Sequence, residues 1–319
     1  MSLLARVKTG RVSRPKYLLV YGKDGIGKTS LVADAPDVFL VCSEQGADEF
    51  DCARFHPQSW DDVMDVCKEL RSSRTNPYKT LAVDTLDWLE PLLWKSVAES
   101  CGKESIEDIG YGRGYTYALE EWRKLNLEFQ ALRASGMHVV LLAHSKIEKF
   151  TDPKNQQHTY DRFVLKLHKG AADFWREAVD AVLFADYEVH RAEDAKTKRI
   201  SIIDGNRRVL YTQWSAGYDA KNRYGLPVKI PLAWPRPWAG LMAAIDKQST
   251  EGSAALIAKI KEGIRALRDE ALAEKVKASL DKAGHDMRQL TTIGSRLEEI
   301  LNSQPEAETP IVEEIPNGN

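Results

Sequence analysis

Residues 22–29 read Gly-Lys-Asp-Gly-Ile-Gly-Lys-Thr, so two glycines bracket four residues and are followed by a lysine and a hydroxyl residue. Glycines allow the backbone to curl until successive N–H groups point at one anion. In such a loop the lysine reaches the outer phosphates of a nucleotide and the hydroxyl binds Mg²⁺. The spacing therefore predicts a nucleoside triphosphate site. Its expected contact residues are Gly22, Lys23, Asp24, Gly25, Ile26, Gly27, Lys28, Thr29 and Ser30.

Nucleotide hydrolysis also needs an acid for the metal and a group that activates water. Asp84 ends the apolar run 80–84, where we expect it to bind Mg²⁺ together with Thr29. Glu44 follows the apolar run 38–42 and is the expected general base. A plain helix cap at position 84 and a surface glutamate at position 44 are the alternatives, and Asp48 or Glu49 could replace Glu44 as the base.

A histidine, His144, follows another apolar run at 137–143. If that run lies between the strands that carry the glycine loop and Asp84, its end faces the outermost phosphate. A polar side chain there can report whether the phosphate is present. A histidine that only satisfies a neighbouring carbonyl is the alternative.

These residues must be positioned by a regular framework, and the hydrophobic pattern indicates one. Apolar runs of strand length alternate with stretches of helical periodicity, which predicts an α/β fold with a mostly parallel sheet between helices. A capping-box pattern at 59–62 opens one helix. The pattern also predicts a glycine- and tyrosine-rich loop at 110–117, an exposed loop at 145–160, and a hairpin of 199–204 with 207–214 around Gly205-Asn206. The expected strands are 16–21, 38–42, 80–84, 137–143 and 181–185, and the expected helices are 28–35, 59–70, 88–97 and 119–132.

The charge distribution and the helical C-terminal pattern divide the chain into four parts. We expect a basic arm at 1–15, an ATPase core at 16–240, a small helical appendage at 250–303 and an acidic, disordered tail at 304–319. The 319 residues carry a net charge of −2 and 43% hydrophobic residues, which is ordinary for a globular protein. No apolar run is long enough for a membrane span, and the cysteines and histidines lack metal-ligand spacing. We expect no membrane partner, reduced cysteines and a cytoplasmic location.

Five segments in this order resemble the RecA-like ATPase superfamily. They are the loop at 22–29, Ser-Glu-Gln-Gly at 43–46, Leu-Ala-Val-Asp-Thr at 81–85, Leu-Leu-Ala-His at 141–144 and Lys-Asn-Arg-Tyr-Gly at 221–225. Within that superfamily the chain is most similar to bacteriophage ATP-binding proteins of the Sak group, which act in single-strand annealing and recombination. The resemblance covers about residues 15–235. It implies a RecA-like P-loop core, to which the C-terminal helices are an addition.

The resemblance also implies roles for single residues. Glu44 matches the catalytic glutamate and Asp84 the metal-binding acid of the family, while His144 stands where RecA has a glutamine. Lys221 and Arg223 match a finger motif that a neighbouring subunit inserts into the site, so the pocket would be completed by a second copy. The implied cofactors are ATP and Mg²⁺, in a homo-oligomeric ring or filament. Basic pairs are common on protein surfaces, so the finger role of Lys221 and Arg223 depends on the family resemblance.

In the family, DNA-binding loops follow the third and fourth strands, which here are residues 110–117 and 145–169. Tyrosine and arginine among glycines suit base stacking and phosphate contact, and a basic loop suits the DNA backbone. An ordinary mobile loop is the alternative for both. The candidate DNA-binding residues are Tyr111, Arg113, Tyr115, Lys146, Lys149, Lys154 and Arg162.

The resemblance favours an oligomeric ATPase, found in the cytoplasm of a bacterial host if phage-encoded, that binds single-stranded DNA and promotes annealing or homologous recombination. A single-strand binding protein is a further partner that such an activity admits, and turnover that is weak or DNA-dependent is compatible with it. A helicase-type ring motor is one alternative. A nucleotide-binding switch or loader that acts on protein partners through the helical end and acidic tail is the other.

Overall fold

The computed structural model describes residues 14–151, 159–193, 200–267, 269–284 and 287–302. By compactness the chain divides into two units, one spanning Arg14–Gln248 and the other taking in the described residues from Ser249 onward. The first unit holds the sheet and all the predicted site residues that the structure describes. No helix among the described residues is both long and apolar enough to cross a bilayer.

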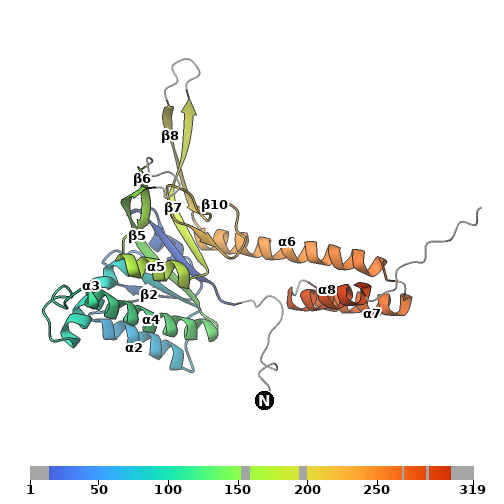
Figure 1. Ribbon diagram of the computed structural model, residues 1–319, viewed down its shortest axis with the longest axis horizontal. Coiled ribbons are helices and arrows are strands. Elements are labelled where there is room, and N and C mark those ends of the chain that lie inside the picture. Colours follow the sequence, from blue (N-terminus) through green and yellow to red (C-terminus); the bar gives the residue numbers. More distant parts are fainter. Residues whose placement is uncertain (1–13, 152–158, 194–199, 268, 285–286, 303–319) are drawn as a thin grey trace, which may run out of the picture. The chain divides into compact units, whose positions relative to one another are not determined.

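Within the described residues ten strands form one sheet, in the order β10-β8-β7-β1-β5-β4-β2-β3, with β6 added to β5 and β9 to β7. The six strands from β7 to β3 are parallel, so their carboxyl ends share one edge. Figure 1 shows β7 and β8 continuing beyond this edge as a long two-stranded ribbon. The strands are β1 (Tyr17–Gly22), β2 (Val38–Cys42), β3 (Ala53–Phe55), β4 (Thr80–Asp84), β5 (His138–Thr151), β6 (Thr159–Leu165), β7 (Ala181–Glu193), β8 (Ile200–Tyr211), β9 (Lys221–Asn222) and β10 (Lys229–Pro231).

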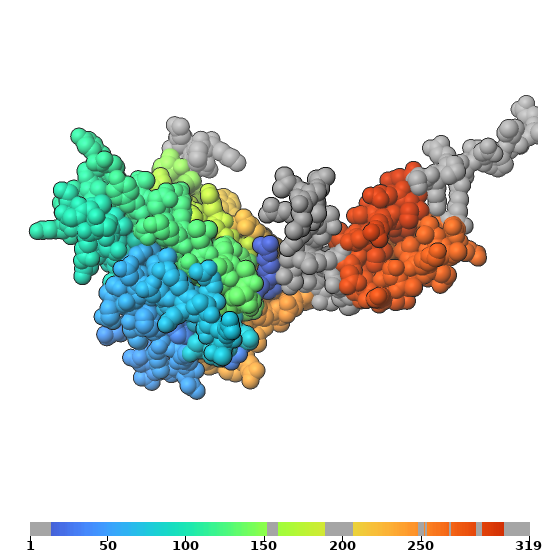
Figure 2. Space-filling view, turned by 90° about the horizontal axis from the view of Figure 1, so that it is seen from below, coloured from blue at the N-terminus to red at the C-terminus, as the bar shows by residue number. Residues whose placement is uncertain are grey.

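Helices cover both faces of the sheet because successive strand residues point to opposite sides. In β1, Tyr17, Leu19 and Tyr21 pack against the layer of α2, α3, α4 and α5. Leu18 and Val20 pack on the other face, against α1 and the first turns of α6. In Figure 2 the segments of the first layer form the blue-to-green surface. The helices of the described residues are α1 (Lys28–Ala33), α2 (Trp60–Ser72), α3 (Leu86–Ser100), α4 (Arg113–Ala134), α5 (Lys169–Ala178), α6 (Pro237–Arg265), α7 (Glu270–Ala283) and α8 (Met287–Asn302).

The predicted α/β fold is confirmed: a mostly parallel sheet lies between helices, the glycine loop follows β1, and the C-terminal part is helical. The capping box at the start of α2 is present: the Ser59 hydroxyl accepts the Asp62 N–H, and the Asp62 carboxylate accepts the Ser59 N–H. In α4, side chains at helical spacing form a buried stripe. The members of that stripe are Ala118, Trp122, Leu125, Phe129 and Leu132.

Three local predictions were wrong. The exposed loop expected at 145–160 is in part a strand, because β5 continues to Thr151 and pairs antiparallel with β6 from Ser145↔Leu165 to Thr151↔Thr159. The hairpin expected around Gly205-Asn206 is the single strand β8, in which that pair falls within a register irregularity opposite β7. The loop expected at 110–117 ends early, since α4 begins at Arg113.

The second unit is a small helical cluster. Buried apolar residues of α6, α7 and α8 form its core. Gly263 of α6 permits close packing, because a Cβ there would lie 2.7 Å from the Leu297 Cδ2 of α8. The core residues are Ile260, Ile264, Leu280, Ala283, Leu290 and Leu297.

Candidate functional site

The glycine loop follows β1 at the carboxyl edge of the sheet and has the backbone that its sequence predicts. Gly25 and Gly27 adopt φ values of 69° and 102°, a region that residues with a side chain rarely enter. Gly22 lies beside β7, where a Cβ would stand only 2.3 Å from the carbonyl oxygen of Ala185. The loop is therefore tied to its neighbouring strand and can be formed only by glycine at these points.

Lys28 lies inside this loop and is almost fully buried. Its Nζ donates to the carbonyl oxygens of Gly22 at 3.2 Å and Lys23 at 3.0 Å. Burial lowers the pKa of the Lys28 ammonium, and the nearby carboxylates of Asp84 and Asp24 oppose that shift. A buried cation with only two neutral acceptors is suited to receive an anion.

Thr29 and Asp84 meet as the metal prediction requires. The Thr29 Oγ1 hydroxyl donates to Asp84 Oδ2 at 2.7 Å. The other oxygen, Asp84 Oδ1, is buried and has no hydrogen-bond partner among the described residues. Burial raises the pKa of Asp84, while the hydrogen bond from Thr29 and the charge of Lys28 lower it. A hydroxyl, a carboxylate and one unsatisfied hard oxygen fit Mg²⁺, which prefers oxygen ligands.

Glu44 lines the same pocket from the end of β2. The preceding residue fixes its position, because the Ser43 N–H donates to the carbonyl oxygen of Asp84 at 2.8 Å and the Ser43 hydroxyl donates to that of Thr85 at 2.8 Å. Burial raises the pKa of Glu44, and the charge of Asp84 raises it further, against the lowering effect of His144. A carboxylate with a raised pKa is a better proton acceptor than an ordinary glutamate.

His144 is held between two carboxylates. In the sheet it pairs with Gly22, at the start of the glycine loop. Its Nδ1 lies 2.8 Å from Asp87 Oδ2, its backbone N–H donates to Asp87 Oδ1 at 2.9 Å, and its Nε2 lies 3.1 Å from Asp24 Oδ1. The hydrogen bond to Asp87 raises the pKa of His144 against the effect of burial. Burial raises the pKa of Asp87, but its hydrogen bonds with His144 outweigh burial and leave that pKa lowered.

Part of this group lines a pocket of about 410 Å³: Glu44 and His144 meet Asp24, Gly25 and Gly27–Ser30 there, as the strand ends predict. Asp84 and Asp87 lie behind that lining, and Ile26 of the loop is packed in the core. Asp87 was missed; its signal is an acid in the first turn of α3, directly after the strand that ends at Asp84. Sequence reasoning also missed four residues that line the pocket from distant segments, which are Phe50, Trp88, Lys166 and Arg208.

Comparison with known proteins gives a family match and distant structural similarities. A protein-family model described as an AAA domain matches residues 14–224. The chain belongs to this AAA-domain family. No curated protein matches it in sequence. Among solved structures it is similar to the RadB recombinase, with 12% identity over 69% of this chain and 89% of that chain and a TM-score of 0.38. It is also similar to the flagellar accessory protein FlaH from Methanocaldococcus jannaschii, with 9% identity over 68% and 85% of the two chains and a TM-score of 0.35.

The chain is therefore an AAA-domain protein whose glycine loop, at residues 22–29, has the sequence pattern of a phosphate-binding loop. The distant likeness to the two solved structures adds no functional argument. The phage Sak group is not among these matches.

The two expected finger residues of the AAA-domain protein lie away from this pocket in the same chain. Lys221 is in β9, which pairs with the first residues of β7 at the opposite edge of the sheet. Its Nζ donates to the carbonyl oxygens that end α5, those of Arg176, Glu177 and Val179, at 2.8–2.9 Å. Arg223 is more exposed and lies 3.5 Å from Asp180. Lys221 thus caps a helix, while a role of either residue in a neighbouring copy stays a prediction.

The candidate DNA-binding residues are spread over three environments. Tyr111 and Arg113 are exposed at the start of α4, and Lys149 is exposed on the β5–β6 hairpin. Tyr115 stacks on the His168 ring at 4.3 Å and bonds Glu107, and Lys146 bonds Glu148 and the Leu167 carbonyl. Arg162 is buried and paired with Asp219. Lys154 lies outside the described residues.

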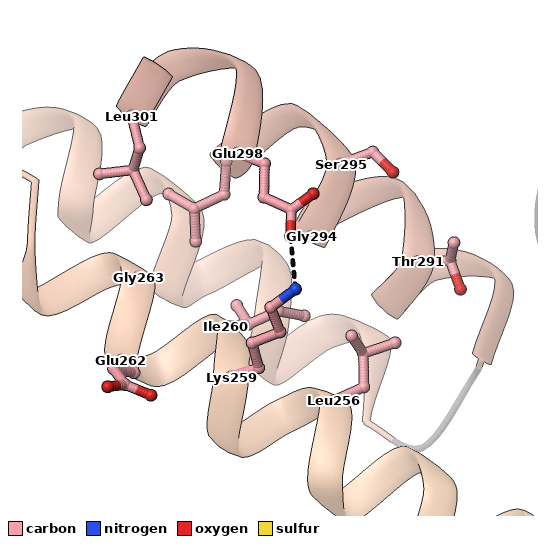
Figure 3. Close-up of a pocket in the computed structure, with 11 residues that line it drawn as sticks. Leu256, Lys259, Ile260, Glu262, Gly263, Thr291, Gly294, Ser295, Glu298 and Leu301 are labelled. Carbon is pink, nitrogen blue, oxygen red and sulfur yellow. Dashed lines mark hydrogen bonds and ion pairs between the residues drawn. The ribbon is translucent and has the colours of Figure 1, made fainter.

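A second hollow, of about 300 Å³, lies between α6 and α8 in the helical unit (Figure 3). Its lining is mainly apolar, including Leu256, Ile260 and Leu301. One ion pair, Lys259 with Glu298 at 2.5 Å, crosses it. Neither the glycine loop nor a candidate catalytic carboxylate lines this hollow.

Proposed function

We propose that this AAA-domain protein hydrolyses ATP with Mg²⁺ and uses the nucleotide to control its binding of single-stranded DNA. The observation that carries the first half is the pair formed by Thr29 and Asp84 at 2.7 Å, next to the buried Lys28, with Asp84 Oδ1 left unpartnered. A purely structural aspartate is expected to have both oxygens satisfied when it is this deeply buried.

Each residue of the site has a defined task in this proposal. Thr29 and Asp84 would hold Mg²⁺, which neutralises phosphate charge when it is bound. Lys28 binds the outer phosphates and stabilises the negative charge that develops on them. Glu44 orients the attacking water and accepts its proton, which its raised pKa favours.

His144 supplies a physical link from the nucleotide to the candidate DNA surface. Its Nε2 is engaged by Asp24 of the glycine loop, so an anion bound there would compete for the same ring nitrogen. Its carbonyl oxygen accepts the Lys166 N–H at 2.9 Å, at the base of the β5–β6 hairpin that carries Lys149. Two contacts of His144, one with Asp24 and one with the Lys166 N–H, therefore connect the phosphate-binding loop to the hairpin.

A second connection runs through α3. Asp87 on this helix holds His144, and Glu90, one turn later, accepts the His168 N–H with both oxygens at 3.0 Å. His168 precedes α5 and stacks on Tyr115 of α4. Both predicted DNA segments are thus attached to the helix that contacts the sensing histidine, which supports nucleotide control of DNA binding.

The DNA surface in this proposal consists of the exposed members of the predicted set. Tyr111 offers a ring with full solvent exposure for base stacking. Arg113 and Lys149 offer exposed cations for phosphates. Annealing or recombination by a homo-oligomer, with Arg223 reaching a neighbouring site, is the activity that the phage resemblance adds.

ATP hydrolysis by the full chain tests the first half. We expect phosphate release that requires Mg²⁺, is abolished by EDTA and is lost in Lys28→Ala. Lys95→Ala, an exposed lysine on α3 paired only with Glu99, is the matched control and keeps the wild-type rate. Mg²⁺-independent hydrolysis, or equal rates in the two variants, would contradict the proposal.

Binding to a labelled single strand, with and without ATP, tests the second half. We expect ATP to change the DNA affinity, and Tyr111→Ala and Lys149→Ala to weaken it. The same comparison in Asp87→Asn separates sensing from binding, because this variant is expected to bind DNA without responding to ATP. A protein that hydrolyses ATP but binds no DNA in either state would instead fit the switch or loader.

A further inference from the structure

The opposite side of the glycine loop from Asp84 carries an arginine that no motif predicts. Arg208 lies on β8 and pairs with Tyr187 of β7 in the antiparallel register. Two residues before Tyr187, Ala185 contacts the loop at Gly22. The strand pairing therefore delivers the side chain of a residue far along the chain to the phosphate pocket, which Arg208 lines.

The guanidinium approaches the loop closely. Arg208 Nη1 lies 3.2 Å from the point where a Cβ of Gly27 would stand. The guanidinium thus lies in close contact with Gly27, the residue whose φ of 102° orients the loop before Lys28.

The charges around Arg208 are not balanced within the described residues. No carboxylate there is paired with its guanidinium, whereas the neighbouring Lys23 is paired with Asp186 at 3.5 Å. Arg208 instead lies against the Tyr187 ring, 5.9 Å from its centroid. Arg208, Lys28 and Lys166 bring three cations to a pocket whose lining also carries the carboxylates of Asp24 and Glu44, and of these cations Arg208 is the one that enters from β8.

We propose that Arg208 binds the phosphate groups of the nucleotide from within the same chain. A planar guanidinium donates two parallel N–H bonds to phosphate oxygens, which a lysine cannot do. The inference rests on the proposed function and deepens it. Because Arg208 of the same chain lines the pocket, phosphate binding does not require a cation from a neighbouring copy.

Calorimetric titration of the full chain with ATP, ADP and AMP tests the proposal at protein concentrations chosen by light scattering to keep the chain monomeric. Loss of a charge-assisted bond to phosphate lowers affinity about 10- to 100-fold. We expect that loss for ATP and ADP in Arg208→Ala, with partial recovery in Arg208→Lys. Arg207→Ala is the matched control, since Arg207 is exposed on the same strand and does not line the pocket. It should stay within about twofold of wild type.

The outcomes separate the inference from the function on which it rests. If wild type and Arg207→Ala bind ATP and Arg208→Ala binds it equally well, Arg208 is not a phosphate ligand and the nucleotide site stands. If none of the proteins binds nucleotide, the proposed function itself fails. Melting temperatures without nucleotide should agree among the variants, because Arg208 is exposed; a large drop in Arg208→Ala would make it a structural residue and overturn the inference.

Discussion

Charged residues gather at both edges of the parallel strands, and the two groups differ in how their polar atoms are satisfied. At the amino edge Asp180 accepts from Arg133 at 2.5 Å and from the Tyr224 hydroxyl at 3.0 Å, and Lys221 fills three carbonyls of α5. At the carboxyl edge Asp84 Oδ1 has no partner among the described residues. The first group is complete by itself, whereas the second has atoms left over for a ligand.

This difference matters because the sequence alone does not distinguish the two groups. Each contains lysine, arginine and aspartate next to buried strands, and each was assigned catalytic residues. The carboxylate oxygens distinguish them: Asp84 Oδ1 is buried without a partner, which costs free energy that a bound cation would recover, whereas Asp180 is paired.

The largest expected effect compares two lysines, one from each edge. Lys28→Ala should lower ATP affinity at least about 100-fold, since a charge-assisted contact to phosphate is lost. Lys221→Ala should leave that affinity within about twofold and lower the free energy of unfolding by about 1 kcal/mol, the order of a lost helix-end contact. Calorimetric titration and urea unfolding measure the two quantities. Equal losses of affinity would erase the distinction between the edges.

Next in size is Arg133→Ala at the amino edge. The Arg133 side chain is 7% exposed, and its removal leaves Asp180 without its main partner. We expect the free energy of unfolding to fall by about 3 kcal/mol, as when one member of a buried pair is removed. Arg123→Ala on the same helix, whose partner Glu120 is exposed, should cost less than about 0.5 kcal/mol. ATP affinity should be unchanged in both; a weaker ATP complex in Arg133→Ala would connect the edges.

Glu90 tests whether burial near the carboxyl edge disfavours the ionised form of a carboxyl group. Burial raises the pKa of Glu90 to about 7 from an ordinary 4.5, although the His168 N–H opposes the shift. Because the folded pKa is the higher one, the stabilising effect of this proton is present below about pH 4.5 and disappears as pH rises through about 7.

Glu90→Gln should therefore flatten the fall in stability between about pH 5 and 8 by about 2 kcal/mol, on the scale of 1.36 kcal/mol per pKa unit. Urea unfolding at a series of pH values measures it. Glu99→Gln, an exposed position on the same helix, is the control. A pH profile identical to wild type would show that Glu90 is ionised as easily as a surface glutamate.

The smallest effect on stability is expected from Arg223→Ala, because this side chain is 57% exposed and its ion pair is 3.5 Å long. The free energy of unfolding should change by less than about 0.5 kcal/mol. If Arg223 acts in a neighbouring copy, a mixture of Arg223→Ala with Lys28→Ala should regain part of the ATPase rate that each lacks alone. A mixture as inactive as its components would confine Arg223 to its own chain.

The sequence was informative for candidate site residues that lie at the carboxyl ends of parallel strands. Glu44, Asp84 and His144 each follow an apolar run, and a parallel sheet necessarily brings such ends together. Asp87 adds to them only through its contact with His144, which needs the strand and helix to be packed before it is visible.

Residues that depend on strand pairing were not predictable in this way. Arg208 reaches the pocket through the register of β8 on β7, beyond an irregularity that no local pattern announces. Arg162 looks like a basic loop residue, yet it is buried on β6 and paired with Asp219, 57 positions away. The strand β6 was missed because its first residues are polar and its sequence shows no regular apolar alternation; its place is set by its antiparallel pairing with β5.

Trp88 stands half exposed on the rim of the phosphate pocket, one residue after Asp87. An indole in that position emits light according to the polarity and charge next to it, so occupancy of the pocket should alter its spectrum. Trp214 and Trp234, which are also exposed, do not line the pocket. The difference between the emission of wild type and Trp88→Phe therefore isolates one signal among eight tryptophans. We expect the intrinsic fluorescence of Trp88 to follow nucleotide binding and release on the millisecond timescale, without an attached dye.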